Sequence, residues 1–331
     1  MKITVLGSGS WGTALAQLLC DNDHEVTLWG HTPAKAEAMQ QTRVNPALPQ
    51  RKLHDHLTVT SDISSVESAE MVVFATPSFA MRGTAALAAS HIKDGAVLVT
   101  VSKGIEKKTH RRMSEIIREE TGDRFPVVAL SGPSHAEEVV MGQPTGCVAA
   151  CEDKAAAEKV QDAFMNKLFR VYSSPDIVGV EICGALKNVV ALCCGICDGM
   201  GYEDNTKALL MTRSMTEMAR LGEALGGTHQ TFAGLAGMGD LIVTCTSMHS
   251  RNRRAGIHIG EGKTVQEAMD AVGAVVEGYY ATDSAWTLAQ DMGIEMPICS
   301  AVYAVLYESA DPRKMLMELM QRDKKEESSW L

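Results

Sequence analysis

The fold is indicated by the stretch MKITVLGSGSWGTALAQLL (residues 1–19), in which an apolar strand pattern runs into a glycine turn and the start of a helix. The turn has the form GxGxxG, with Gly7, Gly9 and Gly12 as its glycines. In this motif the first glycine makes the tight turn, the second lets the backbone approach a pyrophosphate, and the third lets the helix pack on the strand. The stretch therefore predicts a unit that binds a dinucleotide at the positive end of the helix.

The residues after the second predicted strand, EVTLWG (25–30), bear on which dinucleotide is bound. NAD-selective proteins usually carry an acidic residue there to hold the ribose 2′-hydroxyl, whereas this chain has His31, Thr32 and, one turn later, Lys35. Thr32 and Pro33 also suit the cap and first position of the next helix, which does not exclude a role toward the cofactor. Because no carboxylate repels a 2′-phosphate, we expect a pocket that accepts both NAD and NADP.

Strand-like runs continue to alternate with helical stretches, which predicts a mostly parallel sheet covered on both faces. We therefore expect an α/β fold whose N-terminal domain (1–176) is a Rossmann-type doubly wound sheet with ligands at the strand ends. Further expected strands are 57–60, 71–75, 96–101, 127–131, 146–150 and 169–172, and expected helices are 78–90, 109–121 and 153–166.

From about Pro175 the strand pattern stops, and we expect an all-helical substrate-binding domain (177–331). Its first helix should lie at the junction of the two domains, where ligand sites are common. The expected helices are 177–199, 206–225, 264–272, 277–292, 298–308 and 312–321.

The composition argues against several classes of protein. A net charge of -10 disfavours a nucleic-acid partner, and nine cysteines without framework spacing are typical of a reducing compartment. Cys194 and Cys197 form a CxxC motif, but no second pair follows at zinc-site spacing, so we expect core residues and no metal. No charged leader and no apolar run of membrane-spanning length is evident, so we expect a cytoplasmic protein without membrane insertion.

Lys187 lies within GVEICGALKNVVALCCGI (179–196), a stretch that is apolar on every face. A helix of this kind is buried, and burial disfavours a charged ammonium and moves its pKa toward neutrality, which suits a proton donor or acceptor. Alternatively, the stem of the lysine lies along the helix and its head reaches a polar seam. The segment alone leaves both interpretations open.

Polar residues follow three of the predicted strands, in TPSF (76–79), SKGI (102–105) and SGPSHAE (131–137). Lys103 would place a cation where the sheet opens onto the cofactor, suited to stabilising negative charge on a reacting oxygen; the alternative is a solvated loop lysine. The amides of the third loop could face substrate or cofactor, and Ser134 could also cap a helix.

Two further clusters lie in the helical half. Asp240 and Thr244 are one helical turn apart and share a face; Asp240 could cap its helix, or approach Lys187 and favour the ammonium. The run SRNRRAG (250–256) places Arg251 in a first helical turn, where a cation is unfavourable unless an anion is present. A phosphate would relieve the conflict, with Ser250 and Asn252 completing the cradle; the alternative is a solvated charge cluster.

These stretches together resemble the bacterial NAD(P)-dependent glycerol-3-phosphate dehydrogenases over nearly the whole chain. The motifs that carry the resemblance are GSGSWGTAL (7–15), LWGH (28–31), SKGIE (102–106), SGPSHAE (131–137), GALKN (184–188), GMGDL (237–241) and SRNRR (250–254). The resemblance implies reversible reduction of dihydroxyacetone phosphate to sn-glycerol 3-phosphate, which feeds phospholipid synthesis, and it implies a homodimer.

The resemblance also implies roles for individual residues. Lys187 would donate a proton to the C2 oxygen, while Lys103, Asp240 and Thr244 organise the polar site. Related sequences commonly carry arginine at the position of His31. The implied substrate positions are Lys103, Gly132, Ser134, Lys187, Asp240, Ser250, Arg251 and Asn252, and the cofactor positions, with Phe79 as a further candidate, are Gly7, Gly9, Ser10, Trp11, Gly12, His31, Lys103, Ala136, Arg251, Val275 and Glu277.

Two alternatives share part of this pattern. A related two-domain hydroxyacid dehydrogenase would keep the glycine turn and a lysine, but it holds its substrate through a carboxylate and need not have the SRN cluster. A nucleotide-sensing protein without activity would keep GxGxxG but would have no use for a buried lysine.

Overall fold

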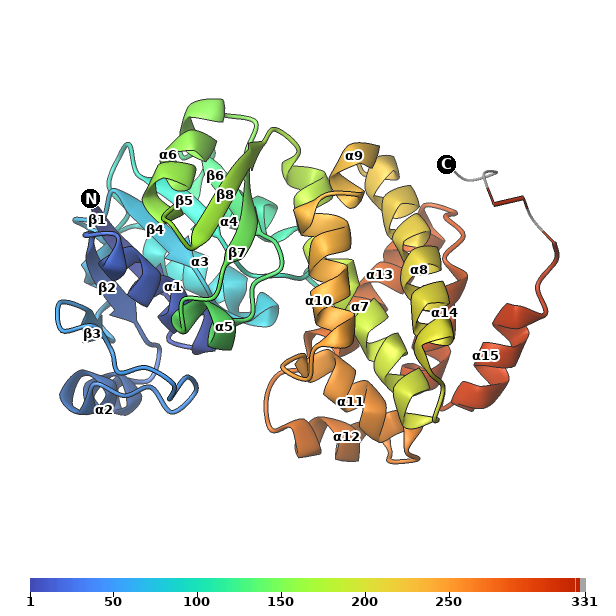
Figure 1. The fold of residues 1–331 in the computed structure, drawn as a ribbon. Coiled ribbons are helices and arrows are strands. Elements are labelled where there is room, and N and C mark those ends of the chain that lie inside the picture. Colours follow the sequence, from blue (N-terminus) through green and yellow to red (C-terminus); the bar gives the residue numbers. More distant parts are fainter. Residues whose placement is uncertain (325, 328–331) are drawn as a thin grey trace. The chain divides into compact units, whose positions relative to one another are not determined.

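The computed structural model describes residues 1–324, 326 and 327, and its chain divides into two compact units. Unit 1 comprises Met1–Lys103 and Arg111–Ile177, and unit 2 comprises Gly104–His110 and the chain from Val178 onward. In Figure 1, unit 1 lies within the blue to green part of the chain, and unit 2 comprises the yellow to red part together with the short segment 104–110. The segment 104–110, which the sequence led us to place in the N-terminal domain, belongs with unit 2.

Unit 1 is built on one eight-stranded sheet with the order β3-β2-β1-β4-β5-β6-β7-β8. All neighbouring strands run parallel except β6 and β7, which are antiparallel, so the expected mostly parallel sheet is confirmed. The strands are β1 (Lys2–Leu6), β2 (Glu25–Trp29), β3 (Thr58–Thr60), β4 (Met71–Phe74), β5 (Val97–Thr100), β6 (Val127–Ser131), β7 (Thr145–Ala150) and β8 (Phe169–Ser174).

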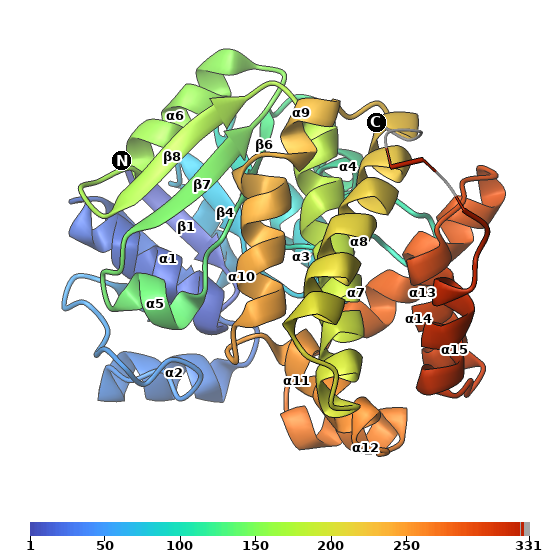
Figure 2. The same ribbon diagram turned by 45° about the vertical axis from the view of Figure 1, so that its right-hand side comes forward.

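Both faces of the sheet are covered by helices. In β4, Met71 and Val73 belong to the apolar cluster that α1, α5 and α6 complete, whereas Val72 and Phe74 belong to the cluster of α3 and α4. This alternation explains why the strand is apolar at every position. The helices, labelled in Figures 1 and 2, are α1 (Ser10–Asp21), α2 (Pro33–Thr42), α3 (Met81–Ala89), α4 (Met113–Thr121), α5 (Ala136–Val140) and α6 (Lys154–Phe164), with the short turns η1 (Ile63–Val66) and η2 (Ser78–Ala80).

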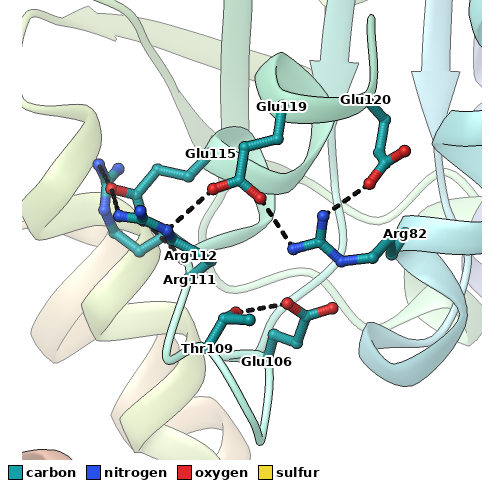
Figure 3. Close-up of polar contacts among 8 residues, drawn as sticks. All are labelled: Arg82, Glu106, Thr109, Arg111, Arg112, Glu115, Glu119 and Glu120. Atoms are coloured by element: carbon teal, nitrogen blue, oxygen red, sulfur yellow. Dashed lines mark hydrogen bonds and ion pairs between the residues drawn. The ribbon is translucent and has the colours of Figure 1, made fainter.

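The helix expected at 109–121 begins later, at Met113. His110 has a φ of +57°, a left-handed conformation that a right-handed helix cannot contain. The Glu115 carboxylate then accepts a hydrogen bond of 2.8 Å from the backbone N–H of Arg112 and satisfies the start of α4. Around this start, Figure 3 shows the ion pairs that Arg82, Arg111 and Arg112 make with Glu115, Glu119 and Glu120.

Unit 2 is helical and packs around α7 (Ile177–Gly199). This 23-residue helix, with a mean hydropathy of 1.8, is long and apolar enough to cross a membrane, which corrects our expectation that no run reaches that length. Its most apolar window is 94% buried inside the protein, so it serves as a core helix. The other helices are α8 (Asp204–Ala224), α9 (His229–Phe232), α10 (Asp240–Thr246), α11 (Arg251–Gly260), α12 (Val265–Val272), α13 (Glu277–Asp291), α14 (Pro297–Tyr307) and α15 (Pro312–Met320), with a π-helical turn at Leu235–Gly239.

All nine cysteines are free thiols and buried. A hydrogen bond with Cys245 and burial raise the pKa of the Cys194 thiol well above its usual range, and burial raises that of Cys299. Within the described part of the chain, no group of three or more histidine, cysteine or acidic residues is arranged to hold a metal ion. The thiols therefore behave as small core side chains.

Glu217 of α8 is a buried carboxylate that caps another helix. Its two oxygens accept hydrogen bonds from the backbone N–H groups of Ile298 (2.7 Å) and Cys299 (3.1 Å), at the start of α14, whose own cap residue makes no side-chain bond. Burial raises the pKa of Glu217 from 4.5 to about 7, although the two N–H donors oppose the shift. The carboxylate thus joins α8 to α14 at an electrostatic cost.

This cost predicts a pH-dependent stability. Between pH 4.5 and about 7 folded Glu217 keeps a proton that the unfolded chain has lost, so stability falls as the pH rises through this window. Relative to Glu217→Gln, the wild type should lose up to about 3 kcal/mol of unfolding free energy. Denaturant unfolding of both proteins across the window measures the difference. Glu318→Gln, at an exposed position, is the control. A difference in unfolding free energy between wild type and Glu217→Gln that does not change with pH would contradict the prediction.

Candidate active site

The three glycines of the first turn occupy different surroundings. Gly7 has a φ of +126°, and a Cβ there would lie 2.5 Å from the carbonyl oxygen of Ala75. A Cβ on Gly12 would lie 1.9 Å from the Gly7 carbonyl oxygen, whereas a Cβ on Gly9 would meet nothing within 4 Å. The first and third glycines are therefore required by close packing, and the space beside Gly9 is open to a ligand.

The start of α1 offers donors to an anion. Gly9 is its cap residue and provides no side-chain cap, and the first N–H groups of a helix have no partner within it. The indole Nε1 of Trp11 is buried and has no hydrogen-bond partner in the described structure. Open space, unsatisfied amides and an unpartnered donor together fit the diphosphate of a dinucleotide.

The end of β2 carries His31, which is exposed and lies edge-on to the ring of Trp29 with centroids 6.0 Å apart. Thr32 is the cap residue of α2 and Pro33 its first residue, as expected, but the Thr32 side chain makes no capping bond. Residues 30–35 contain no carboxylate. The local charge is therefore compatible with a 2′-phosphate.

Lys103, Gly132 and Ser134 converge at the ends of β5 and β6. The Lys103 ammonium donates a hydrogen bond of 3.1 Å to the Gly132 carbonyl, and the Ser134 hydroxyl donates one of 2.9 Å to the same oxygen. Ser134 does not cap α5 as we had considered, because the cap residue is His135 and the hydroxyl points back to Gly132. Ala136 starts α5 and is buried, while Phe79 in η2 is 64% exposed.

Lys187 is held by two side chains of α10. The exposed fraction of its side chain is 8%, and its ammonium forms an ion pair with Asp240, whose side chain is 1% exposed. The ammonium also donates to the Thr244 hydroxyl over 2.8 Å, and that hydroxyl donates to the Asp240 carbonyl over 2.6 Å. The sequence left the position of the lysine head open, and the structure places it in this polar seam.

The chain before α10 explains how Asp240 reaches the lysine. Residues Leu235–Gly239 form a π-helical turn, and a Cβ on Gly237 would lie 2.1 Å from the Phe232 carbonyl oxygen. Asp240 is consequently the first residue of α10, whose cap position is Gly239. Its carboxylate is directed to Lys187 instead of capping the helix. A π-helical turn often marks a functional site.

The start of α11 has the expected cap. The Ser250 hydroxyl accepts a 3.2 Å hydrogen bond from the Arg253 N–H, and Arg251, the first helical residue, is exposed and makes no ion pair with the described residues. The Asn252 amide donates to Asn188 Oδ1 (2.9 Å) and accepts from the Gly278 N–H (2.8 Å). The Ser250 hydroxyl and the Asn252 amide each retain a hydrogen to donate, so they and Arg251 can bind an anion.

The hydrogen bond from Asn252 to Asn188 connects the start of α11 to α7, the helix that carries Lys187. Figure 2 shows α7, α10 and α11 in the same part of unit 2. Glycines on both helices let α7 and α11 cross closely. A Cβ on Gly195 of α7 would lie 2.1 Å from the Arg253 carbonyl oxygen, and a Cβ on Gly260 of α11 would lie 2.1 Å from the Ile196 carbonyl oxygen. Sequence reasoning missed Asn188 and Gly278. The available signal was a second polar residue beside Lys187 in a buried helix.

Comparison with known proteins agrees with this arrangement. A family model described as NAD-dependent glycerol-3-phosphate dehydrogenase N-terminus matches residues 2–157, and one described as the C-terminus of the same family matches residues 176–317. Together the two models cover most of the chain.

Similar proteins match over nearly their full length. The glycerol-3-phosphate dehydrogenase (NAD(P)+) of Moorella thermoacetica is 51% identical, with 98% of this chain and 97% of that protein covered. The protein of the same name from Desulfitobacterium hafniense is 49% identical, with coverages of 98% and 93%. The crystal structure of glycerol-3-phosphate dehydrogenase from Coxiella burnetii has a TM-score of 0.93 and 37% identity, and covers 97% of this chain and 99% of its own.

Proposed function

The chain belongs to the NAD-dependent glycerol-3-phosphate dehydrogenase family, and we propose that Lys187 is the residue that protonates its substrate. The reaction is hydride transfer between NAD(P)H and dihydroxyacetone phosphate. Reduction of the C2 carbonyl leaves negative charge on its oxygen, which needs a proton. The contact between the buried Lys187 ammonium and Asp240 is the observation that carries the proposal.

The partners of Lys187 suit a proton donor. The Asp240 carboxylate stabilises the ammonium and fixes its direction, and Thr244 accepts a second hydrogen bond from it. Burial excludes water, so the charge acts in a low-dielectric environment where it is more effective. In the reverse reaction the same amine, after losing its proton, would accept one from the alcohol. We assign Lys103 to electrostatic stabilisation of the reacting oxygen and of the substrate.

The start of α11 is the proposed phosphate site. Arg251 provides a planar guanidinium that can bind phosphate through two hydrogen bonds. The Ser250 hydroxyl, the Asn252 amide and the helix N–H groups supply further donors. Gly132 and Ser134 of unit 1 are further proposed substrate positions, as are Lys103, Lys187 and Asp240. A substrate that carries a carboxylate in place of the phosphate would not require this set.

The glycine turn and the start of α1 are the proposed site of the cofactor diphosphate. When bound, the nicotinamide cofactor supplies or accepts the hydride at C2. Gly9 leaves space for it, and Trp11 offers an unpartnered donor. The proposed cofactor residues are Gly7, Gly9, Ser10, Trp11, Gly12, His31, Phe79, Lys103, Ala136, Arg251, Val275 and Glu277.

The wider role of the enzyme follows from its product. We propose that it supplies sn-glycerol 3-phosphate for glycerophospholipid synthesis, acts in the cytoplasm and forms a homodimer, because the relatives are bacterial dehydrogenases of this family. The net charge of -10 and the burial of α7 favour a protein that neither binds nucleic acid nor inserts into a membrane. An absorbance assay at the nicotinamide band with dihydroxyacetone phosphate tests the activity directly.

Lys187→Ala should lower turnover by about two to four orders of magnitude, which is the usual cost of losing a positioned proton donor. The dissociation constant of NADH should stay nearly unchanged, because Lys187 acts on the substrate oxygen. Single-turnover absorbance and NADH titration measure the two quantities.

The variant also leaves Asp240 buried without its partner, so the double variant Lys187→Ala/Asp240→Asn should be measured beside it. Lys207→Met breaks another largely buried lysine–aspartate pair of unit 2, with Asp198, and should retain turnover. A Lys187 variant within about threefold of the wild-type rate would remove the lysine from the mechanism.

Arg251→Lys should fail to restore the efficiency lost in Arg251→Ala, because a point charge cannot reproduce the guanidinium fork. Loss of a charged hydrogen bond predicts a decrease of about 10- to 100-fold in kcat/KM for dihydroxyacetone phosphate. Unphosphorylated dihydroxyacetone should be a poor substrate that the variants handle as well as the wild type does. An equal decrease for both ketones would show that Arg251 has a structural role.

His31 should contribute to the preference between NADPH and NADH. Its imidazole can donate a hydrogen bond to the 2′-phosphate, and residues 30–35 contain no carboxylate that would repel this group. The ratio of NADPH to NADH efficiency should therefore be lower in His31→Ala than in the wild type at the same pH. His56→Ala, at another exposed histidine of unit 1, is the control. The same ratio in wild type and His31→Ala would mean that His31 does not contact the phosphate.

A further inference from the structure

Asn45 is a buried amide that none of the roles above uses. It lies in the long loop 43–57 between α2 and β3, and only 2% of its surface is exposed. Its Nδ2 donates to the Ser8 carbonyl (3.0 Å) and to Thr13 Oγ1 (2.6 Å), and its Oδ1 accepts from the Ala47 N–H (2.9 Å). The side chain therefore connects its own loop with the glycine turn and with the first turn of α1.

The chemistry of these partners fixes the orientation of the amide. The Ser8 carbonyl can only accept a hydrogen bond and the Ala47 N–H can only donate one. A reversed amide would set oxygen against oxygen at Ser8 and N–H against N–H at Ala47. The observed arrangement uses both hydrogens of the Asn45 amide nitrogen, so neither is left without an acceptor.

The glycine turn is held from several sides. Gly7 packs against the backbone of Ala75, and a Cβ on Gly30 at the end of β2 would lie 2.7 Å from Ser8 Oγ. Asn45 holds the Ser8 carbonyl. Gly9 alone among the three motif glycines faces open space. The packing and the Asn45 bonds thus fix the turn while its ligand side stays accessible.

We propose that Asn45 is a positioning residue for the dinucleotide. By holding Ser8 and Thr13 in place, its amide keeps the N–H groups at the start of α1 in the arrangement that binds the diphosphate. Less conformational entropy is then lost when the dinucleotide binds. This inference rests on one part of the proposed function, namely that the cofactor diphosphate binds at the glycine turn and the start of α1. Because NADH and NADPH share the diphosphate, the effect should be equal for both and independent of the ketone substrate.

Gln17 of α1 offers a matched control, because its side chain also connects α1 with the loop 43–57. It is 1% exposed, and its side chain donates to the Lys52 carbonyl (2.8 Å) and accepts from the His54 N–H (2.6 Å). Gln17 thus anchors the loop 43–57 to α1 without a bond to the glycine turn. Its loss should weaken the fold of the loop but leave the diphosphate site formed.

The experiment compares wild type, Asn45→Ala, Asn45→Asp and Gln17→Met as full chains. Nucleotide dissociation constants come from quenching of tryptophan fluorescence, KM for dihydroxyacetone phosphate from the absorbance assay, and Tm from thermal unfolding. Both Asn45 variants should raise the constants for NADH and NADPH by about tenfold, because both lose the hydrogen bond that holds the Ser8 carbonyl. The KM for the ketone should stay within about twofold in every variant, and Gln17→Met should lower Tm with unchanged nucleotide affinity.

Asn45→Asp separates the loss of the hydrogen-bond donor from a loss of packing. The aspartate keeps an oxygen that accepts from the Ala47 N–H, but its carboxylate has no hydrogen to donate to the Ser8 carbonyl. It also decides the matter if Asn45→Ala does not fold. Wild-type affinity in Asn45→Asp, or an equal loss in Gln17→Met, would overturn the proposal. A wild type that binds NADH but does not reduce dihydroxyacetone phosphate would contradict the function and leave the Asn45 comparison valid.

Discussion

The buried ion pair between Lys187 and Asp240 is the interaction on which the arrangement of unit 2 depends. An ammonium in an apolar helix is costly unless a partner compensates it, and removal of one partner leaves an unpaired buried charge. Asp240 compensates Lys187 only because a π-helical turn sets it at the first position of α10. The pair therefore fixes α10 against α7, and it brings Thr244 to the same ammonium.

The close crossing of α7 and α11 determines where the proposed phosphate site at the start of α11 lies. Gly195, Gly199, Gly256 and Gly260 allow the two backbones to approach to a distance that any side chain would prevent. The bond from Asn252 to Asn188 then joins the start of α11 to the residue after Lys187. Helix packing, more than loop geometry, thus sets the distance between the proposed proton donor and the proposed phosphate site.

The sequence was most informative where periodicity was strong. Continuous apolar runs gave the strands of the sheet, and α7 was placed at its correct residues. Local conformation was harder to foresee, since the left-handed His110 delays α4. Contacts between residues far apart in the sequence could not be predicted. Asp240 could equally have capped its helix instead of contacting Lys187, and no local signal indicates the hydrogen bond between Asn252 and Asn188.

The buried cysteines have a practical consequence. A thiol reacts only where a reagent can reach it, and all nine thiols are buried, so the folded protein should react slowly with alkylating reagents. Unfolding would expose nine thiols at once. Thiol modification can therefore be used to detect loss of structure, and its rate would report how often the core opens under native conditions.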